Sequence, residues 1–245
     1  MLAIAGLAMS QSAACKSPAS IASVAVAANF REAAEEVGAA FEAATGHRVR
    51  FSFGSTGQLF VQIAQGAPFD AFLAADRARA ATVVRDGHAV AGSRFTYATG
   101  RIVLYSIVDN LVTGPQTLAG GAFAKLAIAE PATAPYGAAA VETMRALGVL
   151  DGVEDRIVRG TNVAQAHQFV RSGNADLGFI ALSQAARHPD GSRWVVPASL
   201  HSTIAQDAVL LNRGARNPAA RAFLDFLKHP KAEAILRRHS YGVGD

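Results

Sequence analysis

The sequence predicts an α/β protein of two lobes, each a mostly parallel β-sheet flanked by helices, joined by two crossing strands. The first observation is that short apolar runs alternate with segments of helical periodicity along most of the 245 residues, which is typical of a parallel sheet covered on both faces. The second is that two long extended runs, 97–108 and 204–211, interrupt this alternation. They separate two sets of strand–helix units, so we expect the second lobe to be inserted into the first.

The first set of units begins at Ser23 and supplies three strands. Apolar runs at 24–27, 49–53 and 71–75 are each followed by a helical pattern, at 30–44, 58–65 and 77–86. Two further helical segments lie near the C-terminus, at 218–228 and 231–239. Together these elements form the predicted first lobe, residues 23–97 plus 204–245.

The second set lies between the extended runs and forms the predicted second lobe, residues 98–203. Its strands are expected at 126–129, 156–159, 177–181 and 194–196, and its helices at 137–147 and 163–171. In an arrangement of this kind a ligand binds between the lobes, outside the carboxyl ends of the strands.

The composition excludes several classes of protein. With 51% hydrophobic and 17% charged residues, the chain can bury a substantial core and is not disordered as a whole. The net charge is +4, but the Lys and Arg residues are scattered, without the basic and aromatic clustering typical of nucleic-acid binding. The seven histidines are dispersed, with no pair at metal-ligand spacing. The sequence therefore indicates neither a nucleic-acid partner nor a metal centre.

The N-terminal residues 1–22 have the pattern of an export signal. A short apolar run at 1–9, too short to span a bilayer, is followed by small residues that end at Cys15. Cys15 is the only cysteine. At this position it is either discarded with the signal or becomes the lipid-modified first residue of an exported lipoprotein.

Four predicted helix starts carry small, hydroxyl or amide residues directly after a strand. Asn29 with Glu32, and Asn162 with Gln165, form capping patterns. Ser55 and Thr56 precede the helix at 58–65, and residues 134–137 precede the helix that runs to 147. A helix start offers free N–H groups and a positive dipole end to an anion. A single cap of this kind is more often structural than ligand-binding, but two starts in each lobe together predict an anion site without a cation.

Several short segments form a combined pattern that is specific even though each is weak alone. In the first lobe they are VAVAANF (24–30), FSFGSTGQL (51–59) and GAPFDAFLAAD (66–76), with Phe226, Leu227, Tyr241 and Gly242 near the C-terminus. In the second lobe they are AEP (129–131), APYG (134–137), GTNV (160–163) and ADLGF (175–179). Over nearly everything after the signal-like segment, the chain resembles the periplasmic molybdate-binding proteins of ABC transporters.

This resemblance implies a type II periplasmic binding protein fold that closes on a tetrahedral oxyanion. The ligand it implies is molybdate or tungstate, with no cofactor, and the partner is a membrane ABC permease that receives the ion from a periplasmic monomer. The donors it implies are neutral: the side-chain amide and backbone of Asn29, the hydroxyl and N–H of Thr56, the backbone N–H and phenol of Tyr136, and the backbone N–H of Val163, with Ala28 and Ser55 beside them.

The chain departs from part of the family at Ala181, where some members carry a tyrosine on the corresponding strand. An alanine side chain cannot donate a hydrogen bond, so the resemblance assigns the missing phenol to Tyr136. The contribution of the strand around Ala181 is left open.

Two other functions remain as alternatives. One is a binding protein for another oxyanion, such as sulfate, or for an organic anion. The size of the cavity would distinguish these ligands, and the sequence does not show it. The other is a hydrolase that uses a serine in the turn at 54–57, although this turn lacks the G-x-S-x-G pattern and no histidine stands out as a base. We expect Asp70 and Asp76 to be structural, the latter as a helix cap, and Asp176 to support the hinge.

Overall fold

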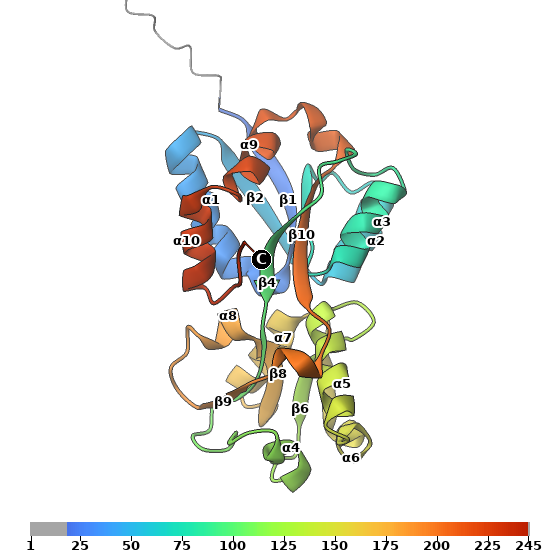
Figure 1. Cartoon of the computed structure of the whole chain (residues 1–245), viewed down its shortest axis with the longest axis vertical. Helices are drawn as coiled ribbons and strands as arrows, with labels where there is room; N and C mark the ends of the chain where they lie inside the picture. The colour runs from blue at the N-terminus through green and yellow to red at the C-terminus, as the bar shows by residue number, and fades with distance from the viewer. Residues whose placement is uncertain (1–18, 245) are drawn as a thin grey trace, which may run out of the picture.

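The computed structural model describes residues 19–244 and consists of two lobes, one above the other in Figure 1. Of the signal-like segment 1–22, residues 1–18, including Cys15, lie outside the described residues. Each lobe is built around one five-stranded sheet. Among the described helices, none is long and apolar enough to cross a membrane.

The sheet of the first lobe has the strand order β2-β1-β3-β10-β4. β1 pairs in parallel with β2 and β3, whereas β10 runs antiparallel to β3 and β4. The strands are β1 (Ile21–Ala27), β2 (Arg48–Gly54), β3 (Ala71–Leu73), β4 (Phe95–Gly100) and β10 (Ile204–Leu210).

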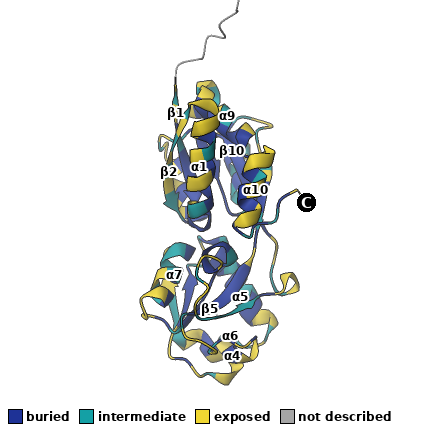
Figure 2. Cartoon of the chain, turned by 90° about the vertical axis from the view of Figure 1, so that its left-hand side faces the viewer, coloured by how far each residue is buried: buried dark blue, intermediate teal, exposed yellow. Residues whose placement is uncertain are grey.

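Helices cover both faces of this sheet, as Figures 1 and 2 show. Successive residues of β1 alternate between the faces: Val24 and Val26 pack with one apolar cluster, and Ala25 packs with another. The first cluster receives side chains from α1 (Arg31–Thr45), α9 (Pro218–Phe226) and α10 (Pro230–Arg238). The second receives them from α2 (Thr56–Ala64) and α3 (Arg77–Arg85). Short 3₁₀ turns lie at η1 (Ala28–Phe30) and η4 (Asn212–Arg216).

The sheet of the second lobe has the strand order β7-β6-β8-β5-β9. β6 pairs in parallel with β7 and β8, whereas β5 runs antiparallel to β8 and β9. The strands are β5 (Ile102–Ser106), β6 (Leu126–Ala129), β7 (Ile157–Gly160), β8 (Leu177–Ala181) and β9 (Ser192–Val195).

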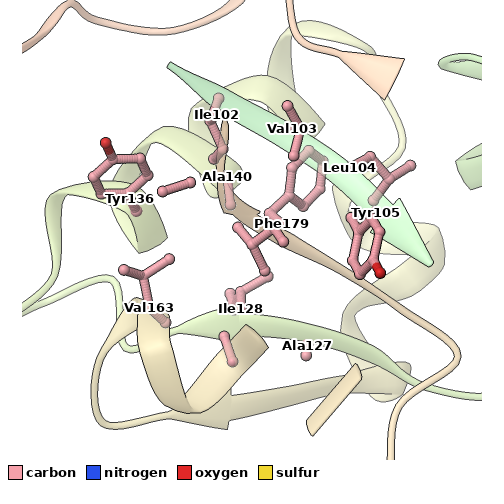
Figure 3. Close-up of a cluster of buried hydrophobic side chains, with 14 of the residues drawn as sticks. Ile102, Val103, Leu104, Tyr105, Ala127, Ile128, Tyr136, Ala140, Val163 and Phe179 are labelled. Carbon is pink, nitrogen blue, oxygen red and sulfur yellow. The ribbon is translucent and has the colours of Figure 1, made fainter. Parts of the chain in front are cut away.

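The core of the second lobe joins this sheet to two longer helices, α5 (Pro135–Ala146) and α7 (Val163–Arg171). Figure 3 shows Tyr136 and Val163, one from the first turn of each helix, at one side of this apolar cluster. The remaining elements are short: α4 (Gln116–Gly120), α6 (Leu150–Val153), α8 (Leu182–Ala185), η2 (Glu154–Arg156) and η3 (Ala198–Leu200).

The two lobes are joined by the crossing segments that the sequence predicts. β4 leads through Arg101 into β5, and the chain returns through residues 196–203 into β10. β4 continues beyond the predicted lobe boundary at 97/98 as far as Gly100, which pairs with Ile204. Because the chain leaves the first lobe along β4 and returns along β10, these two strands run antiparallel. The expected α/β fold of two lobes is confirmed, but the sheets are mixed rather than mostly parallel.

Candidate functional site

A pocket between the lobes brings together all six residues that the sequence predicts. Ala28, Asn29, Ser55 and Thr56 come from the first lobe, and Tyr136 and Val163 come from the second. The other lining residues are Ala27, Gly54, Ala75, Ala134, Pro135 and Asn162. The pocket has a cavity volume of about 10 Å³, far below the roughly 300–1,000 Å³ typical of pockets for drug-sized ligands. Its size therefore suits a small ion.

Three helices of nine residues or more begin at this pocket. Ser55 caps α2, because its Oγ accepts the N–H of Gln58 and its own N–H is 3.4 Å from the Gln58 side chain. Asn162 caps α7 by accepting the N–H of Gln165 at 3.1 Å. α5 begins at Pro135 without a side-chain cap. The three positive helix ends attract negative charge to one point.

The fourth predicted helix start is different. The expected capping pair of Asn29 and Glu32 is wrong, because β1 passes directly into a 3₁₀ turn at Ala28–Phe30 and α1 begins only at Arg31. The residue that precedes α1 is therefore Phe30, which makes no side-chain cap. Asn29 is left in the turn, with its side chain buried.

The side-chain amide of Asn29 is already committed to other protein groups. Its Nδ2 donates to the Oε1 atom of Gln206 at 3.0 Å and to the hydroxyl of Tyr241 at 3.1 Å. An amide nitrogen has two hydrogens, so neither remains for a ligand. The expectation that this amide donates to the anion does not agree with the structure. The side chain orients its neighbours instead.

The hydroxyl groups at the pocket keep their own protons available. Thr56 Oγ1 accepts the backbone N–H of Ala75 at 3.0 Å, and Ser55 Oγ accepts that of Gln58 at 3.3 Å. The Tyr136 hydroxyl accepts from the Nε2 atom of Gln206 at 3.4 Å. A hydroxyl that accepts from an N–H group still has one proton to donate. The three hydroxyls are therefore arranged as donors.

The lining carries no charged side chain: among the residues that the structure describes there, none is Asp, Glu, Lys, Arg or His. Burial raises the pKa of the Tyr136 phenol well above its usual value, and burial has the same effect on Tyr97 and Tyr241 nearby. These phenols stay protonated and neutral at physiological pH. The pocket thus presents N–H and O–H groups without a formal positive charge.

Three residues that were not among the predicted site residues complete this arrangement: Ser183, Gln206 and Tyr241. Ser183, from the second lobe, lies with its Oγ 3.1 Å from the Tyr241 hydroxyl and 3.3 Å from the carbonyl oxygen of Asn29. Gln206 lies on β10 and is fully buried. No helix-start pattern marks them as site residues, and they are more than 150 residues from Asn29 in the chain.

Ala181 does not line the pocket. It is buried at the end of β8, and its N–H donates to the Oε1 atom of Gln184 at 3.3 Å. Tyr136 is the tyrosine among the described lining residues. The side chain from this part of the second lobe that reaches the first lobe is Ser183, two residues later.

The lobes touch each other beside the pocket. The N–H of Gly57 donates to the carbonyl oxygen of Thr133 at 2.8 Å, and Nη2 of Arg79 donates to that of Ala132 at 2.6 Å. Both bonds join α2 or α3 of the first lobe to the loop that follows β6 in the second. The structure is therefore a closed form of the molecule.

The three aspartates have structural partners. Asp76 caps α3 by accepting the N–H of Arg79 at 2.7 Å, as predicted. Asp70 is buried and accepts from the Ser23 N–H and from the Arg213 guanidinium. Asp176 accepts the N–H groups of Ala124 and Lys125 at the start of β6. The expected role of Asp176 in the hinge is wrong, because it lies at the opposite end of β8 from the crossing strands.

Within the described residues, this site has neither a metal-binding cluster nor a histidine base. No group of three or more His, Cys, Asp or Glu residues there is arranged to hold a metal ion. The Oγ atom of Ser55 is engaged as a helix cap. A serine nucleophile requires a base within hydrogen-bond reach, and no histidine lines the pocket in the described residues.

Comparison with known proteins places the chain in a family. The family model described as bacterial extracellular solute-binding protein matches residues 22–242. The chain belongs to this family. The molybdate-binding protein ModA of Rhodobacter capsulatus is 48% identical over 217 residues, which cover 89% of this chain and 86% of that protein. The ModA protein of Azotobacter vinelandii is 47% identical over 234 residues, 94% of this chain and 93% of that protein.

The fold is also shared with a solved structure, that of the periplasmic molybdate-binding protein of Azotobacter vinelandii. The two superpose with a TM-score of 0.88 at 39% sequence identity, over 91% of this chain and 100% of the other. The family member described here therefore has the fold of the periplasmic binding proteins. Its similar relatives are, by name, substrate-binding proteins.

Proposed function

We propose that this protein binds molybdate, and also tungstate, in the pocket between its lobes. The observation that carries the proposal is the donor-only lining: three helix starts and three hydroxyls face one small pocket without a charged side chain. The relatives named molybdate-binding proteins support it. The proposed ligand groups are the hydroxyls of Thr56, Ser55 and Tyr136 and the backbone N–H groups of Ala28, Asn29, Thr56, Tyr136 and Val163.

Neutral donors are expected to make the pocket select among oxyanions according to whether the ion carries a proton. Hydrogen bonds to a charged acceptor are stronger than neutral ones, so several of them compensate a dianion without a buried ion pair. Monohydrogen phosphate carries an O–H group, which would meet only donors in this pocket. The unpaired hydrogen costs about 1–3 kcal/mol. We therefore expect fully deprotonated tetrahedral dianions to be preferred.

The alternative ligand is sulfate, a smaller dianion with the same charge. Since charge does not separate sulfate from molybdate, their discrimination depends on the fit of the closed pocket. A larger ion allows both lobes to contact it at hydrogen-bond distance, whereas a smaller one leaves some donors too far away. The names of the similar relatives favour molybdate.

We propose hinge closure as the mechanism. The first lobe captures the dianion through Ala28, Asn29 and Thr56, and the second lobe then adds Tyr136 and Val163 and excludes water. The bending segments are the crossing strands near Gly100 and Ile204, close to the predicted boundaries at 97/98 and 203/204.

Delivery requires a partner that opens the lobes again. We propose that the closed form docks as a monomer on a membrane ABC permease, after export of the chain to the periplasm with Cys15 as a candidate lipid anchor. A disulfide engineered across the mouth of the pocket is expected to preserve ion binding and to block uptake. Unchanged uptake with the disulfide intact would contradict this mechanism.

Titration calorimetry with molybdate, tungstate, sulfate and phosphate tests the proposed ligand. We expect one ion per protein for molybdate and tungstate, and a thermal shift that corresponds to about 2.7 kcal/mol when the ion is at a hundred times its Kd. Heat with sulfate and none with molybdate would overturn the assignment.

We propose that the protein is not an enzyme. An esterase and phosphatase screen of the wild type against Ser55→Ala and Thr56→Ala tests this point. Turnover that disappears in either variant would establish the hydrolase alternative instead.

A further inference from the structure

A chain of buried hydrogen bonds runs behind the pocket from one lobe to the other. It starts at the hydroxyl of Tyr241, which donates to the carbonyl oxygen of Asn29 at 2.7 Å. A carbonyl oxygen only accepts, so this bond uses the only proton of the Tyr241 hydroxyl. The side-chain amide of Asn29 must therefore present its donor, Nδ2, to this hydroxyl.

This first bond fixes the polarity of the next two groups. Asn29 turns Nδ2 toward the Tyr241 hydroxyl at 3.1 Å, and the second hydrogen of Nδ2 points to Gln206 at 3.0 Å. Gln206 must then present Oε1, its acceptor, to Asn29. The hydroxyl of Tyr97 donates to the same Oε1 atom at 2.9 Å and holds the amide in this orientation.

This chain of hydrogen bonds ends at the Tyr136 hydroxyl, at the pocket. With Oε1 turned to Asn29, the Nε2 atom of Gln206 faces the Tyr136 hydroxyl at 3.4 Å. The hydroxyl accepts there, and among the described residues its own proton has no acceptor. Gly100 makes this approach possible, because a Cβ at this position would lie 2.2 Å from the Tyr136 hydroxyl oxygen.

We propose that Gln206 is a positioning residue that directs the hydroxyl proton of Tyr136 at the bound anion. The inference rests on the proposed function, since it assigns Tyr136 as a donor to the oxyanion. Gln206 is fully buried on a crossing strand and bonds to Asn29 of the first lobe and Tyr136 of the second. Gln206 can therefore orient the Tyr136 hydroxyl only when the lobes are closed.

The test is a double-mutant cycle on anion affinity, with Gln206→Met, Tyr136→Phe and the double variant measured by calorimetry. A hydrogen bond to a charged group corresponds to roughly 10- to 100-fold in affinity, and we expect each single variant to lose about this much. The double variant is expected to bind no more weakly than Tyr136→Phe, because without the hydroxyl there is no proton to direct. Tyr105→Phe is the matched control, since this hydroxyl bonds to Arg171 and Tyr105 does not line the pocket, and it is expected to bind within threefold of the wild type.

Gln206→Glu is the second variant, because it keeps the shape and reverses the polarity. Its carboxylate accepts the Tyr136 proton and repels the dianion, so it is expected to lose more affinity than Gln206→Met while the circular dichroism spectrum stays native. The inference is overturned if Gln206→Met weakens binding equally with and without the Tyr136 hydroxyl, or if either Gln206 variant binds like the wild type.

The cycle is measured with whichever of the four oxyanions the wild type binds. If that ion is sulfate, the proposed ligand fails while the role of Gln206 is still decided. If none of the four binds to the wild type, both proposals are wrong.

Discussion

The substitution Gly57→Ala is expected to impair closure of the two lobes without destabilising either lobe. Gly57 lies in the first turn of α2, and its N–H bonds to Thr133 of the other lobe at 2.8 Å. An added Cβ would lie 2.9 Å from the Cα atom of Thr133 and 3.0 Å from its Cβ and carbonyl oxygen. Carbon atoms in contact prefer about 3.5–4.0 Å, so the lobes must move apart at this point by about half an ångström or more.

The magnitude follows from the cost of overpacking, about 1–3 kcal/mol, which applies to the closed form alone. Since 1.4 kcal/mol is tenfold in affinity, Gly57→Ala is expected to weaken molybdate binding by about 5- to 150-fold. With the lobes apart, alanine is the better helix residue by roughly 0.5–1 kcal/mol. The variant is therefore expected to bind more weakly while its ligand-free Tm stays equal or rises.

Calorimetric titration measures the affinity, and differential scanning calorimetry measures the Tm. Gly152→Ala is the matched control, because an added Cβ in that short helix meets nothing within 4 Å, and its affinity is expected to be unchanged. Wild-type affinity in Gly57→Ala would show that the bound form does not close to this distance. A lower Tm would show that the substitution damages the first lobe rather than closure.

Three further predictions concern a donor, a pH dependence and an interlobe contact. Thr56→Val removes a hydroxyl donor and is expected to lose about 10-fold or more in molybdate affinity, whereas Thr56→Ser retains most of it; equal titration curves for the two variants would contradict the donor role. Burial, with repulsion from His188 and Arg171, lowers the pKa of His167 from its usual value of 6.5 to about 4. The unfolded chain therefore takes up the proton first, and the free energy of unfolding is expected to fall by on the order of 2 kcal/mol as the pH drops from about 6.5 to 4. Urea titrations of His167→Gln should show a smaller pH dependence, and an identical dependence would refute the assignment. Arg79→Ala removes the bond to the Ala132 carbonyl and is expected to raise the dissociation rate of molybdate by about three- to tenfold; stopped-flow measurements that show only a slower association would exclude the closed-state role.

Much of the architecture follows from local pattern. The alternation of Val24, Ala25 and Val26 between two apolar clusters is what a strand covered on both faces predicts. Strand β1 and helices α5 and α7 lie where apolar runs and helical periodicity indicate them. The mixed character of the sheets was not predicted, because pairing between β4 and β10 joins residues about a hundred positions apart.

The site was predictable to the extent that helix starts define it. Thr56, Tyr136 and Val163 each stand in the first turn of a helix that begins at the pocket. Asn29 shows where local reasoning fails: its capping pattern predicts a helix start, but the residue lies in a 3₁₀ turn that directly follows strand β1. Gln206 and Ser183 act only through contacts made by the folded chain, so no short pattern identifies them.

The most direct test of the account is an anomalous diffraction experiment on crystals grown with molybdate, with data collected on both sides of the molybdenum K edge. The account predicts one strong peak per molecule, between the lobes, within hydrogen-bond distance of the Thr56 hydroxyl and of the backbone N–H groups of Tyr136 and Val163. A peak elsewhere on the molecule, or a pocket between closed lobes with no molybdenum signal, would contradict it.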